Sequence, residues 1–488
     1  EHIGQKTFYQ LFPNQYNEWL LKDEKGYIFP LKEDGTLNED AIFDNISDNI
    51  QTADAFVRES YKGGLVLLRD NKIKRCVTDD DVYPQNKLFN GLQEVRTGKG
   101  VALDCTSMYP YRLHSKSGTY YPIKQPIYLY SKNELNYTYN ELYDILKYEK
   151  RIVSKCDVIN YINNAKYFRH LVSLLKSLNL DNPATNREEA AISLSLNMGR
   201  VSNKEVPLNY EYINVYRFIK FRCSFRLKDD GIPCVLVPNL GSQSTSFLRC
   251  NKTISSLGDV VELTLSQTDF ELFVENYNIF NFEAIQMIEY EAKIGLFDSF
   301  VDRYFSAKQN SKGVHRALNK SILNNCTGRM GRKKIVGVAV PYIDEKGRLS
   351  FKVDDTLMAE EVHAYVPVAS ALLSSARKCL IYGIKNIFPT TFNYSDTDSL
   401  KVEESLESVE KKINADELYT LGTTLGDWKN DLGDGVEFDE AIYLKLKTYT
   451  CKADGKYHIT AAGISRRATH IMEEYFSLSD ELKQIDDK

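Results

Sequence analysis

The residues best suited to metal chemistry lie in one short stretch, Asp396-Thr397-Asp398, with the aromatic Tyr394 before it and Ser399 after it. Two carboxylates one residue apart share one face of a strand, whereas a hairpin bend between them would splay them apart. In either case, burying this charge costs several kcal/mol unless a cation compensates it. Carboxylate oxygens are ligands that Mg²⁺ prefers. The stretch therefore predicts a magnesium site, although a solvated acidic turn would also explain it.

The positive charge of the chain is concentrated in one region. The net charge is −5, but residues 302–334 hold nine basic residues and one acid. Four bases recur every four residues, which predicts a helix over residues 307–325 with a basic stripe that drifts ~40° per step. These bases are Lys308, Lys312, Arg316 and Lys320. A second face of the helix is expected to pack through Val314, Ala317, Leu318, Ser321 and Ile322. A polyanion opposite the stripe would relieve its repulsion, and a solvated basic face is the alternative.

Three motifs resemble those of family B DNA polymerases. Residues 104–110, which follow an apolar run, resemble motif A (D-x-x-S-L-Y-P), and residues 394–399 resemble motif C (Y-x-D-T-D-S). Residues 320–328 resemble motif B (K-x-x-x-N-S-x-Y-G), with Asn325 in place of Ser and Thr327 in place of Tyr. Thr327 offers no ring to pack beside the nascent base pair, and base–aromatic stacking is worth roughly 1–3 kcal/mol.

Two further motifs resemble the protein-primed branch of that family. Residues 61–64 resemble its Y-x-G-G motif, and residues 447–449 resemble its K-x-Y motif, which contacts the primer terminus. The resemblance begins near Tyr61 and is interrupted by residues 131–212. It implies an α+β, right-hand fold of palm, fingers and thumb, with an antiparallel palm sheet and family-specific insertions.

The resemblance also implies a division of the chain. Residues 1–60 would be a segment that follows a missing exonuclease domain, 61–130 the first part of the palm with Y-x-G-G and motif A, and 131–212 a helical insertion. Residues 213–305 would be palm and a terminal-protein-binding insertion, 306–332 the fingers with motif B, and 333–362 a hairpin insertion for strand displacement and processivity. Residues 363–425 would be the second part of the palm with motif C, and 426–488 the thumb.

Roles for single residues follow from the same resemblance. The implied catalytic residues are Asp104, Asp398, Asp396 and Lys320, and the implied metal ligands are Asp104, Asp398 and the main chain of Cys105. Asp396 is expected to act mainly through its charge. The implied nucleotide-binding residues are Ser107, Met108, Tyr109, Lys308, Lys320 and Asn324. The implied DNA-binding residues are Tyr61, Gly63, Gly64, Tyr394, Thr397, Lys447 and Tyr449.

The implied activity is template-directed DNA synthesis by two-metal nucleotidyl transfer, with protein-primed replication of a linear viral or plasmid genome. Two Mg²⁺ ions, with Mn²⁺ as a substitute, would lie about 3.5–4 Å apart. The implied partners are template and primer DNA, deoxynucleoside triphosphates and a terminal protein. Tyr109 would lie under the sugar, where its ring excludes a 2′-hydroxyl.

Periodicity predicts the remaining elements. An apolar strand is expected at 65–68, helices at 142–152, 161–178 and 365–382, and alternating strands at 219–227 and 233–237. Thr268-Asp269 is expected to cap a helix that carries Phe270, Leu272, Phe273 and Tyr277. Residues 334–353 are expected to form a hairpin. A helical start is expected near Phe8, Leu11 and Phe12, with a loop at 30–35.

Bulk properties narrow the class of protein. A chain of 488 residues is expected to form two to four subdomains. Nine cysteines without a C-x-x-C pair favour reduced thiols in the cytoplasm, the host's if the protein is viral, over a zinc module or disulfide framework. No apolar run is long enough to span a membrane. Because Glu1 replaces an initiating Met, we expect a segment of a longer protein.

Two other functions remain open at this stage. A metal-dependent nuclease would use the same acids, but it would not explain the basic segment or the Ser-x-Tyr-Pro sequence after Asp104. A catalytically weak, polymerase-like DNA-binding scaffold is favoured by Thr327 and disfavoured by the intact acids and Lys320.

Overall fold

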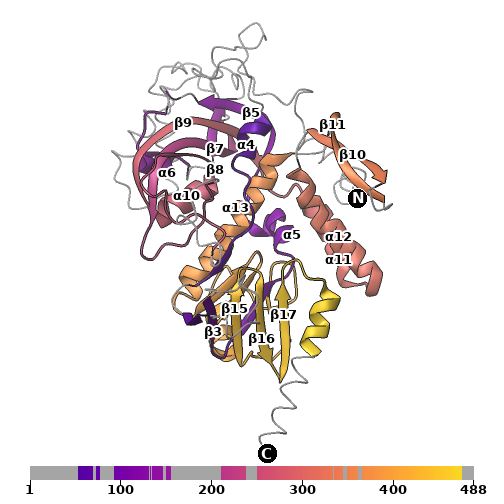
Figure 1. Cartoon of the computed structure of the whole chain (residues 1–488). Coiled ribbons are helices and arrows are strands. Elements are labelled where there is room, and N and C mark those ends of the chain that lie inside the picture. Colours follow the sequence, from indigo (N-terminus) through magenta and orange to yellow (C-terminus); the bar gives the residue numbers. More distant parts are fainter. Residues whose placement is uncertain are drawn as a thin grey trace, which may run out of the picture.

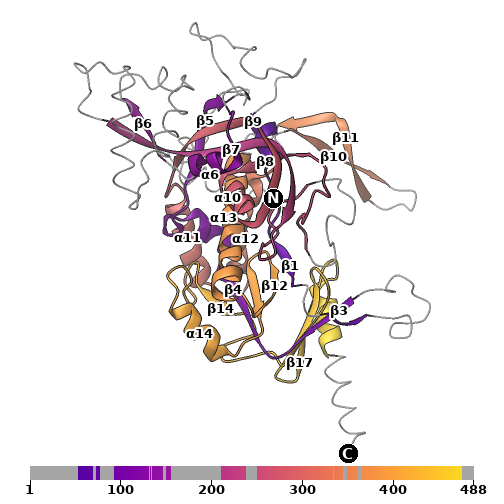
Figure 2. The same cartoon turned by 90° about the vertical axis from the view of Figure 1, so that its left-hand side faces the viewer.

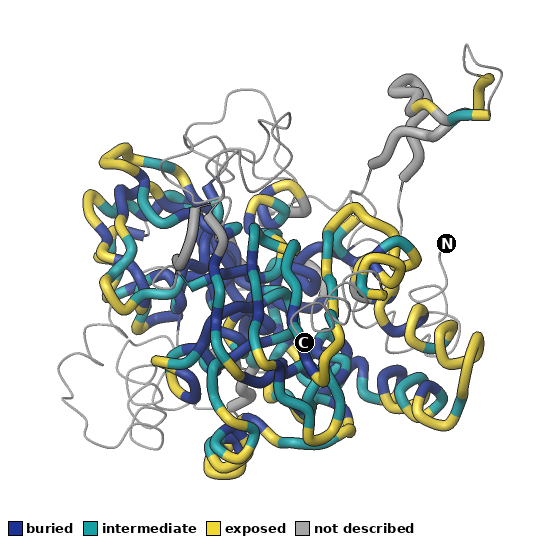
Figure 3. Tube along the Cα trace, turned by 60° about the horizontal axis from the view of Figure 1, so that its bottom comes forward, coloured by how far each residue is buried: buried dark blue, intermediate teal, exposed yellow. Residues whose placement is uncertain are grey.

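The computed structural model describes residues 53–69, 73–76, 93–130, 132, 135–146, 150–154, 210–237, 250–332, 335–343, 349–360 and 365–474. In these residues the strands form three five-stranded sheets and one two-stranded hairpin. Figure 1 shows one sheet in an upper lobe, a second in a lower lobe, and a long central helix that links them. Buried residues concentrate in the middle of the molecule and exposed residues along its rim (Figure 3).

The central sheet is antiparallel throughout. Its order is β1 (Val66–Leu68), β12 (Phe392–Asp396), β13 (Ser399–Val402), β4 (Val101–Cys105) and β14 (Trp428–Asn430). Every residue of β4 is buried except Asp104, which is partly exposed. Figure 2 shows β1, β4, β12 and β14 grouped below the upper lobe. The sheet therefore places Asp396 of β12 and Asp104 of β4 on either side of Ser399 of β13, which is the register partner of both.

The central helix α13 (Val366–Tyr382) packs on this sheet and continues into a π-helical turn, Gly383–Ile387. Pro367 suits its first turn, where no intrahelical N–H bond is needed. The helix is buried on nearly all sides, as expected for a core helix. Its one buried cation, Arg377, forms an ion pair with Asp269 at 2.6 Å.

The upper lobe is built on long strands. Its sheet has the order β5 (Tyr121–Tyr130), β9 (Tyr277–Lys293), β7 (Tyr210–Leu227) and β6 (Lys150–Ser154), and β8 (Val261–Ser266) pairs with β7. Three helices accompany it: α4 (Ala53–Arg58), α6 (Tyr139–Leu146) and α10 (Gln267–Asn276). Phe221 packs against Phe270, Phe273 and Phe282, so aromatic rings join α10 to the sheet.

A helical pair flanks the central helix. It comprises α11 (Asp298–Gln309) and α12 (Gly313–Met330), which lie beside the short helix α5 (Met108–Leu113) and the 3₁₀ turn Ser115–Ser117 (Figure 1). The hairpin of β10 (Ile335–Ile343) and β11 (Leu349–Glu360) follows α12. Figure 2 shows this hairpin projecting from the body of the molecule.

The lower lobe joins distant parts of the chain. Its sheet has the order β17 (Lys456–Ala461), β16 (Thr448–Ala453), β15 (Glu440–Lys445), β3 (Gln93–Thr97) and β2 (Ile73–Cys76). Helix α14 (Leu406–Asn414) lies in the chain between β13 and β14, and its Val409 and Ile413 pack in the core of the central sheet. Tyr394 of β12 packs with Tyr443 and Tyr449 of this sheet, which ties the lower lobe to the end of β12 that carries Asp396.

Several predicted elements are confirmed. The strand at 65–68 is β1, the hairpin at 334–353 is β10–β11, and the helix at 365–382 is α13. The strand at 219–227 is part of β7, and a helix does follow Thr268. The sheet that holds the acids is antiparallel, as expected for the palm.

The prediction of a single basic helix over residues 307–325 is wrong. The segment is split between α11 and α12, and Lys312 caps α12 with extended backbone, so Lys308 belongs to a different helix from Lys320. The predicted packing face is also largely wrong, because Val314 is 83% exposed and Leu318 45% exposed. The buried side chains of α12 lie further along, at Ile322, Leu323, Cys326 and Met330. Charge periodicity cannot detect a break of three residues that keeps the basic side chains on one side.

Other corrections concern element ends. The helix expected to reach Ile152 stops at Leu146, and Ile152 lies in β6. The cap of α10 is Ser266, whose hydroxyl accepts a hydrogen bond from Asp269 N, and Tyr277 begins β9. Residues 233–237 form no strand, although they are largely buried. β14 lies in the central sheet, so that sheet extends past the proposed palm–thumb boundary at 425/426.

Some predictions fall outside the described residues: the helical start near Phe8, the loop at 30–35 and the helix at 161–178. In the described part of the chain, no helix has the length and apolar character needed to cross a membrane.

Candidate active site

Asp104 and Asp398 meet through strand pairing. Ser399 is the register partner of Asp104, and Cys105 N donates a hydrogen bond to Asp398 O at 3.0 Å. The hairpin bend between β12 and β13 passes through Thr397, whose φ is +67°, and Asp398 N donates to Asp396 O at 2.7 Å. Of the two geometries considered from the sequence, the structure has the bend. The pairing of β4 with β13 thus brings Asp104 and Asp398, which are far apart in the sequence, to one site.

The acids repel one another at this site. Burial, with the charges of Asp104 and Asp396 next, raises the pKa of Asp398 to about 7. Burial also raises the pKa of Asp104, even though Lys429 Nζ lies 3.2 Å from its carboxylate. Asp431 adds further negative charge near both groups. Burial and the neighbouring carboxylates therefore both disfavour the charged form of Asp398 at this site.

The buried, neighbouring carboxylates of Asp104 and Asp398 are suited to binding a divalent cation. Among the described residues, no group of three or more His, Cys, Asp and Glu side chains forms a closed metal cage. The two carboxylates instead form an open site, as Mg²⁺ uses when water and substrate phosphates supply its other ligands. Asp104 and Asp398 would hold such an ion, and its charge would lower the pKa of both groups.

Asp396 is engaged by other side chains. Its carboxylate pairs with Lys447 and accepts hydrogen bonds from Thr397 Oγ1 at 2.9 Å and Tyr394 Oη at 3.4 Å. Lys447, in the bend between β15 and β16, also donates its N–H to Tyr394 Oη at 2.9 Å. Asp396 therefore acts on the site through its charge, and it connects the acids to the lower lobe.

Cations from both flanking helices face the acids. Lys308 of α11 donates to Ser107 Oγ at 2.8 Å, and burial together with Lys320 and Arg316 lowers its pKa. Lys320 of α12 is exposed, yet its charge acts on both Asp104 and Asp398. Ser107 has φ +56°, which turns the chain from β4 into α5. This arrangement can receive a polyphosphate between the helices and the acids.

The remaining predicted residues are placed as follows. Asn324 lies exposed on α12, one turn beyond Lys320, and Thr327 lies in the same helix. The side chain of Met108 is buried, which leaves only its main chain for a ligand. Tyr61 packs against Gly331 at the end of α12, where an added Cβ would lie 2.3 Å from its ring.

Tyr109 connects the acids with residues 61–64. Burial, with Asp398 second, raises the pKa of its hydroxyl to about 12. An added Cβ on Gly64 would lie 3.4 Å from Tyr109 Oη and 3.3 Å from Thr397 Cγ2. At Gly63 the same test meets nothing within 4 Å. The backbone of Gly64 therefore packs directly against the aromatic ring and the motif C bend.

Tyr449 packs against Tyr394 and Lys401. The two rings lie 5.0 Å apart, and Lys401 Nζ lies 4.5 Å from the centre of the Tyr449 ring. Lys401 also donates to Tyr449 Oη at 3.3 Å. Lys447 and Tyr449, predicted from a weak motif, thus both lie next to the end of β12.

Sequence reasoning missed Lys429, Asp431 and Lys401. Lys429 is the register partner of Asp104 on β14 and directly follows the sequence Leu-Gly-Asp-Trp. No sequence signal assigns that lysine to the acids, because the pairing depends on β14 adding to the outer edge of β4.

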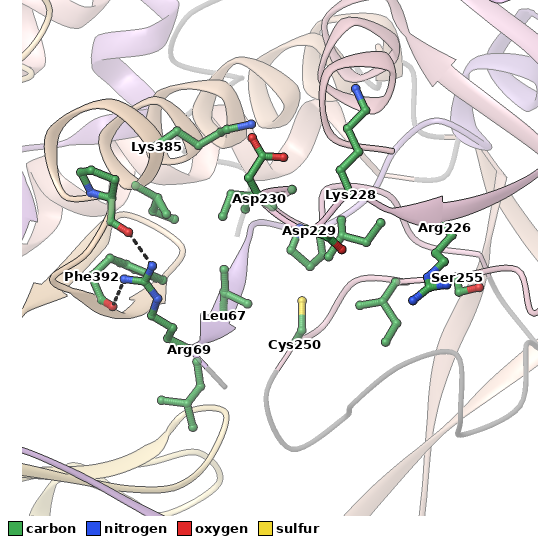
Figure 4. Close-up of a pocket in the computed structure, with 18 residues that line it drawn as sticks. Leu67, Arg69, Arg226, Lys228, Asp229, Asp230, Cys250, Ser255, Lys385 and Phe392 are labelled. Atoms are coloured by element: carbon green, nitrogen blue, oxygen red, sulfur yellow. Dashed lines mark hydrogen bonds between the residues drawn. The ribbon is translucent and has the colours of Figure 1, made fainter. Parts of the chain in front are cut away.

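A cavity of about 790 Å³ lies apart from this site. Figure 4 shows Leu67, Arg69, Cys250, Arg226 and Lys385 around it. None of the predicted site residues lines it. The acids, the basic helices and Tyr109 therefore define the candidate active site without this cavity.

The buried Lys252 leads to a prediction about how the unfolding free energy depends on pH. It is 1% exposed, and burial, with Arg377 next, lowers its pKa from 10.5 to about 7, against the opposing effects of Asp269, Cys250 and Cys234. Between pH 7 and 10.5 the unfolded chain holds a proton that the folded chain has released, so this group makes the unfolding free energy rise with pH. We expect wild type to gain about 2 kcal/mol relative to Lys252→Met between pH 7 and 9.

Urea unfolding at both pH values measures this difference. Titrations of other groups are shared by wild type and variant, so they cancel in the comparison. An equal pH dependence of the two proteins would show that Lys252 keeps an ordinary pKa when folded.

Comparison with known proteins agrees with the geometry. Residues 205–416 match the family model of DNA polymerase type B, organellar and viral. The chain is 29% identical to the DNA polymerase of Bacillus phage phi29 over 251 residues, which are 51% of this chain and 39% of that protein. It is 28% identical to the DNA polymerase of Streptococcus phage Cp-1 over 271 residues, 53% of this chain and 43% of that protein.

Solved structures agree on the fold. The phi29 DNA polymerase complexed with primer-template DNA and incoming nucleotide superposes with a TM-score of 0.58 and 20% identity, over 96% of this chain and 60% of that one. The chain thus spans less than two thirds of the relatives it matches. Over about half of its length, the chain is therefore similar to type B DNA polymerases of phages such as phi29.

Proposed function

We propose that the chain carries out template-directed DNA synthesis by nucleotidyl transfer, primed by a terminal protein during replication of a linear viral or plasmid genome. The observation that carries the proposal is the convergence of Asp104 and Asp398, in one turn-and-strand contact, beside the cations of α11 and α12. Phi29 DNA polymerase, which this chain resembles in fold, has been solved in complex with primer-template DNA and incoming nucleotide, which supports the same partners here.

The side chains divide the work between the two reacting groups. Asp104 and Asp398 would hold Mg²⁺, which supplies charge neutralisation and a more acidic primer 3′-hydroxyl. Lys308 and Lys320 stabilise negative charge on the triphosphate as it develops, and Ser107 orients Lys308 through their hydrogen bond. Lys447 and Tyr449 lie where a primer end would approach the acids, and Lys447 also balances the charge of Asp396.

Protein priming and the division into domains belong to the same proposal. The upper-lobe sheet around β7 and β9 is proposed to receive the terminal protein, and the β10–β11 hairpin to support strand displacement. Seven described cysteines are free, which suits the reducing cytoplasm proposed for the protein.

Primer extension with a labelled primer-template, Mg²⁺ and deoxynucleotides tests the activity. Growth of the primer that needs both Mg²⁺ and nucleotide is the expected result. Primer shortening would instead indicate a nuclease, and DNA binding without either reaction would indicate a scaffold.

Replacing Tyr109 by Val should weaken discrimination against ribonucleotides. A Cβ added at Gly64 would lie 3.4 Å from Tyr109 Oη, and the charge of Asp398 acts on the same hydroxyl, so a smaller side chain here leaves room for a 2′-hydroxyl. We expect ribonucleotide incorporation relative to deoxynucleotide to rise about 10- to 100-fold, as when a well-packed contact worth one to three kcal/mol is lost. Single-nucleotide insertion kinetics measure the ratio. An unchanged ratio would remove Tyr109 from the sugar site.

A further inference from the structure

The loop of residues 61–64, called here the glycine loop, is held on one side by three polar side chains. Lys252 Nζ donates to Gly63 O at 2.8 Å, and Asn251 Nδ2 donates to Gly64 O at 2.9 Å. Arg377 Nη1 donates to both Lys62 O and Gly63 O at 2.8 Å. Three consecutive carbonyls are thus satisfied by side chains that come from elsewhere in the chain.

The segment with Asn251 and Lys252 adds to the open edge of the central sheet. Asn251 N donates to Val66 O at 3.1 Å, and Val66 N donates to Asn251 Oδ1 at 3.0 Å. Cys250 forms an isolated bridge with Leu67, and Figure 4 shows these two residues next to each other beside the cavity. Leu65, Leu67 and Cys250 also belong to the buried apolar core, so packing and these hydrogen bonds together hold this edge.

Lys252 is a costly way to make such a contact. Its side chain is 1% exposed, and burying an ammonium group away from water is unfavourable. Arg377, equally buried, has Asp269 as a two-pronged partner at 3.0 and 2.6 Å. An apolar residue in place of Lys252 would avoid the burial cost and lose only the hydrogen bond to the loop. The presence of a polar side chain at this buried place therefore points to a role in positioning the glycine loop.

The opposite side of the glycine loop faces the reacting groups. A Cβ added at Gly64 would lie 3.4 Å from Tyr109 Oη and 3.3 Å from Thr397 Cγ2, and Thr397 N donates to Leu65 O at 2.9 Å. The glycine loop therefore lies between the polar side chains of Asn251, Lys252 and Arg377 on one side and Tyr109 on the other. If the glycine loop moves back, Tyr109 can move back with it.

We propose that Asn251 and Lys252 are positioning residues for sugar selection: they hold the glycine loop against Tyr109 and so help to exclude ribonucleotides. The proposal rests on the proposed DNA synthesis. Neither residue touches the nucleotide, and both act through Gly63, Gly64 and Tyr109.

Lys252→Met tests the proposal, because Met keeps the length of the side chain and removes its donor. Thr253→Val is the matched control: Thr253 Oγ1 accepts a hydrogen bond from Val237 N at 2.9 Å, in the same segment but away from the loop. We expect ribonucleotide incorporation relative to deoxynucleotide to rise roughly three- to tenfold in Lys252→Met, the effect of losing one hydrogen bond, and to stay at the wild-type ratio in Thr253→Val. Equal ratios in all three proteins would overturn the proposal.

Hydrogen exchange separates this idea from the proposed function. The peptide covering residues 61–68 should exchange faster in Lys252→Met than in wild type and Thr253→Val, whether or not the protein extends primers. If wild type fails to extend a primer, the proposed function fails, and with it sugar selection, while exchange still decides whether Lys252 holds the loop. Unchanged exchange in Lys252→Met would contradict the positioning role itself.

Discussion

Replacing Asp398 by Ala should lower the rate of primer extension by at least about a thousandfold. A bound metal ion contributes several kcal/mol of charge stabilisation, and each 1.36 kcal/mol is tenfold in rate. Burial, with the charges of Asp104 and Asp396 next, raises the pKa of Asp398 to about 7, and a bound cation would stabilise its charged form. Steady-state primer extension at saturating Mg²⁺ measures the loss.

A matched control separates this loss from a general effect of removing a carboxylate. Asp434 is exposed and lies in the loop that follows β14, so Asp434→Asn should extend primers at the wild-type rate. DNA binding by Asp398→Ala should remain close to wild type, since the basic helices are intact. Comparable extension by Asp398→Ala and wild type would show that the acids do not carry the reaction.

Replacing Lys320 by Ala should have the second largest effect, a fall of about 100- to 1000-fold in kcat/KM for the incoming nucleotide. Lys320 acts electrostatically on Asp104, Asp398 and Lys308, which places it beside the predicted triphosphate position. A charge that stabilises the developing phosphate negative charge lowers kcat as well as raising KM when it is removed. Single-turnover insertion over a range of nucleotide concentrations separates the two.

Lys411 of α14 provides the control for this variant. It is exposed on a helix other than α11 and α12, and its removal changes the net charge by the same amount. Lys411→Ala should therefore insert nucleotide like wild type. If both variants lose the same amount of activity, the effect of Lys320 is one of overall charge and not of position.

The acids were predictable from the sequence because each carries local context. Asp396 and Asp398 lie in a motif whose spacing indicates a bend or a strand, and Asp104 ends an apolar run that becomes β4. Their meeting was implied by the resemblance, and the structure confirms it through the β4–β13 pairing.

Residues that depend on tertiary pairing were not predictable. Lys429 faces Asp104 only because β14 extends the sheet, and Lys252 reaches Gly63 only because residues 250–253 cross the edge of β1. The break between α11 and α12 escaped detection for a related reason. Lys308 is buried against Ser107, so its place is set by packing that a periodic charge pattern does not report.

The central claim is that Asp104 and Asp398 together hold divalent cations beside the cationic helices. Electron paramagnetic resonance of Mn²⁺, titrated into protein with primer-template DNA and a non-hydrolysable nucleotide, measures this directly. The account predicts about two strongly bound ions in wild type and in Asp434→Asn. It predicts none in the double variant Asp104→Asn, Asp398→Asn, and undiminished Mn²⁺ binding by that variant would contradict it.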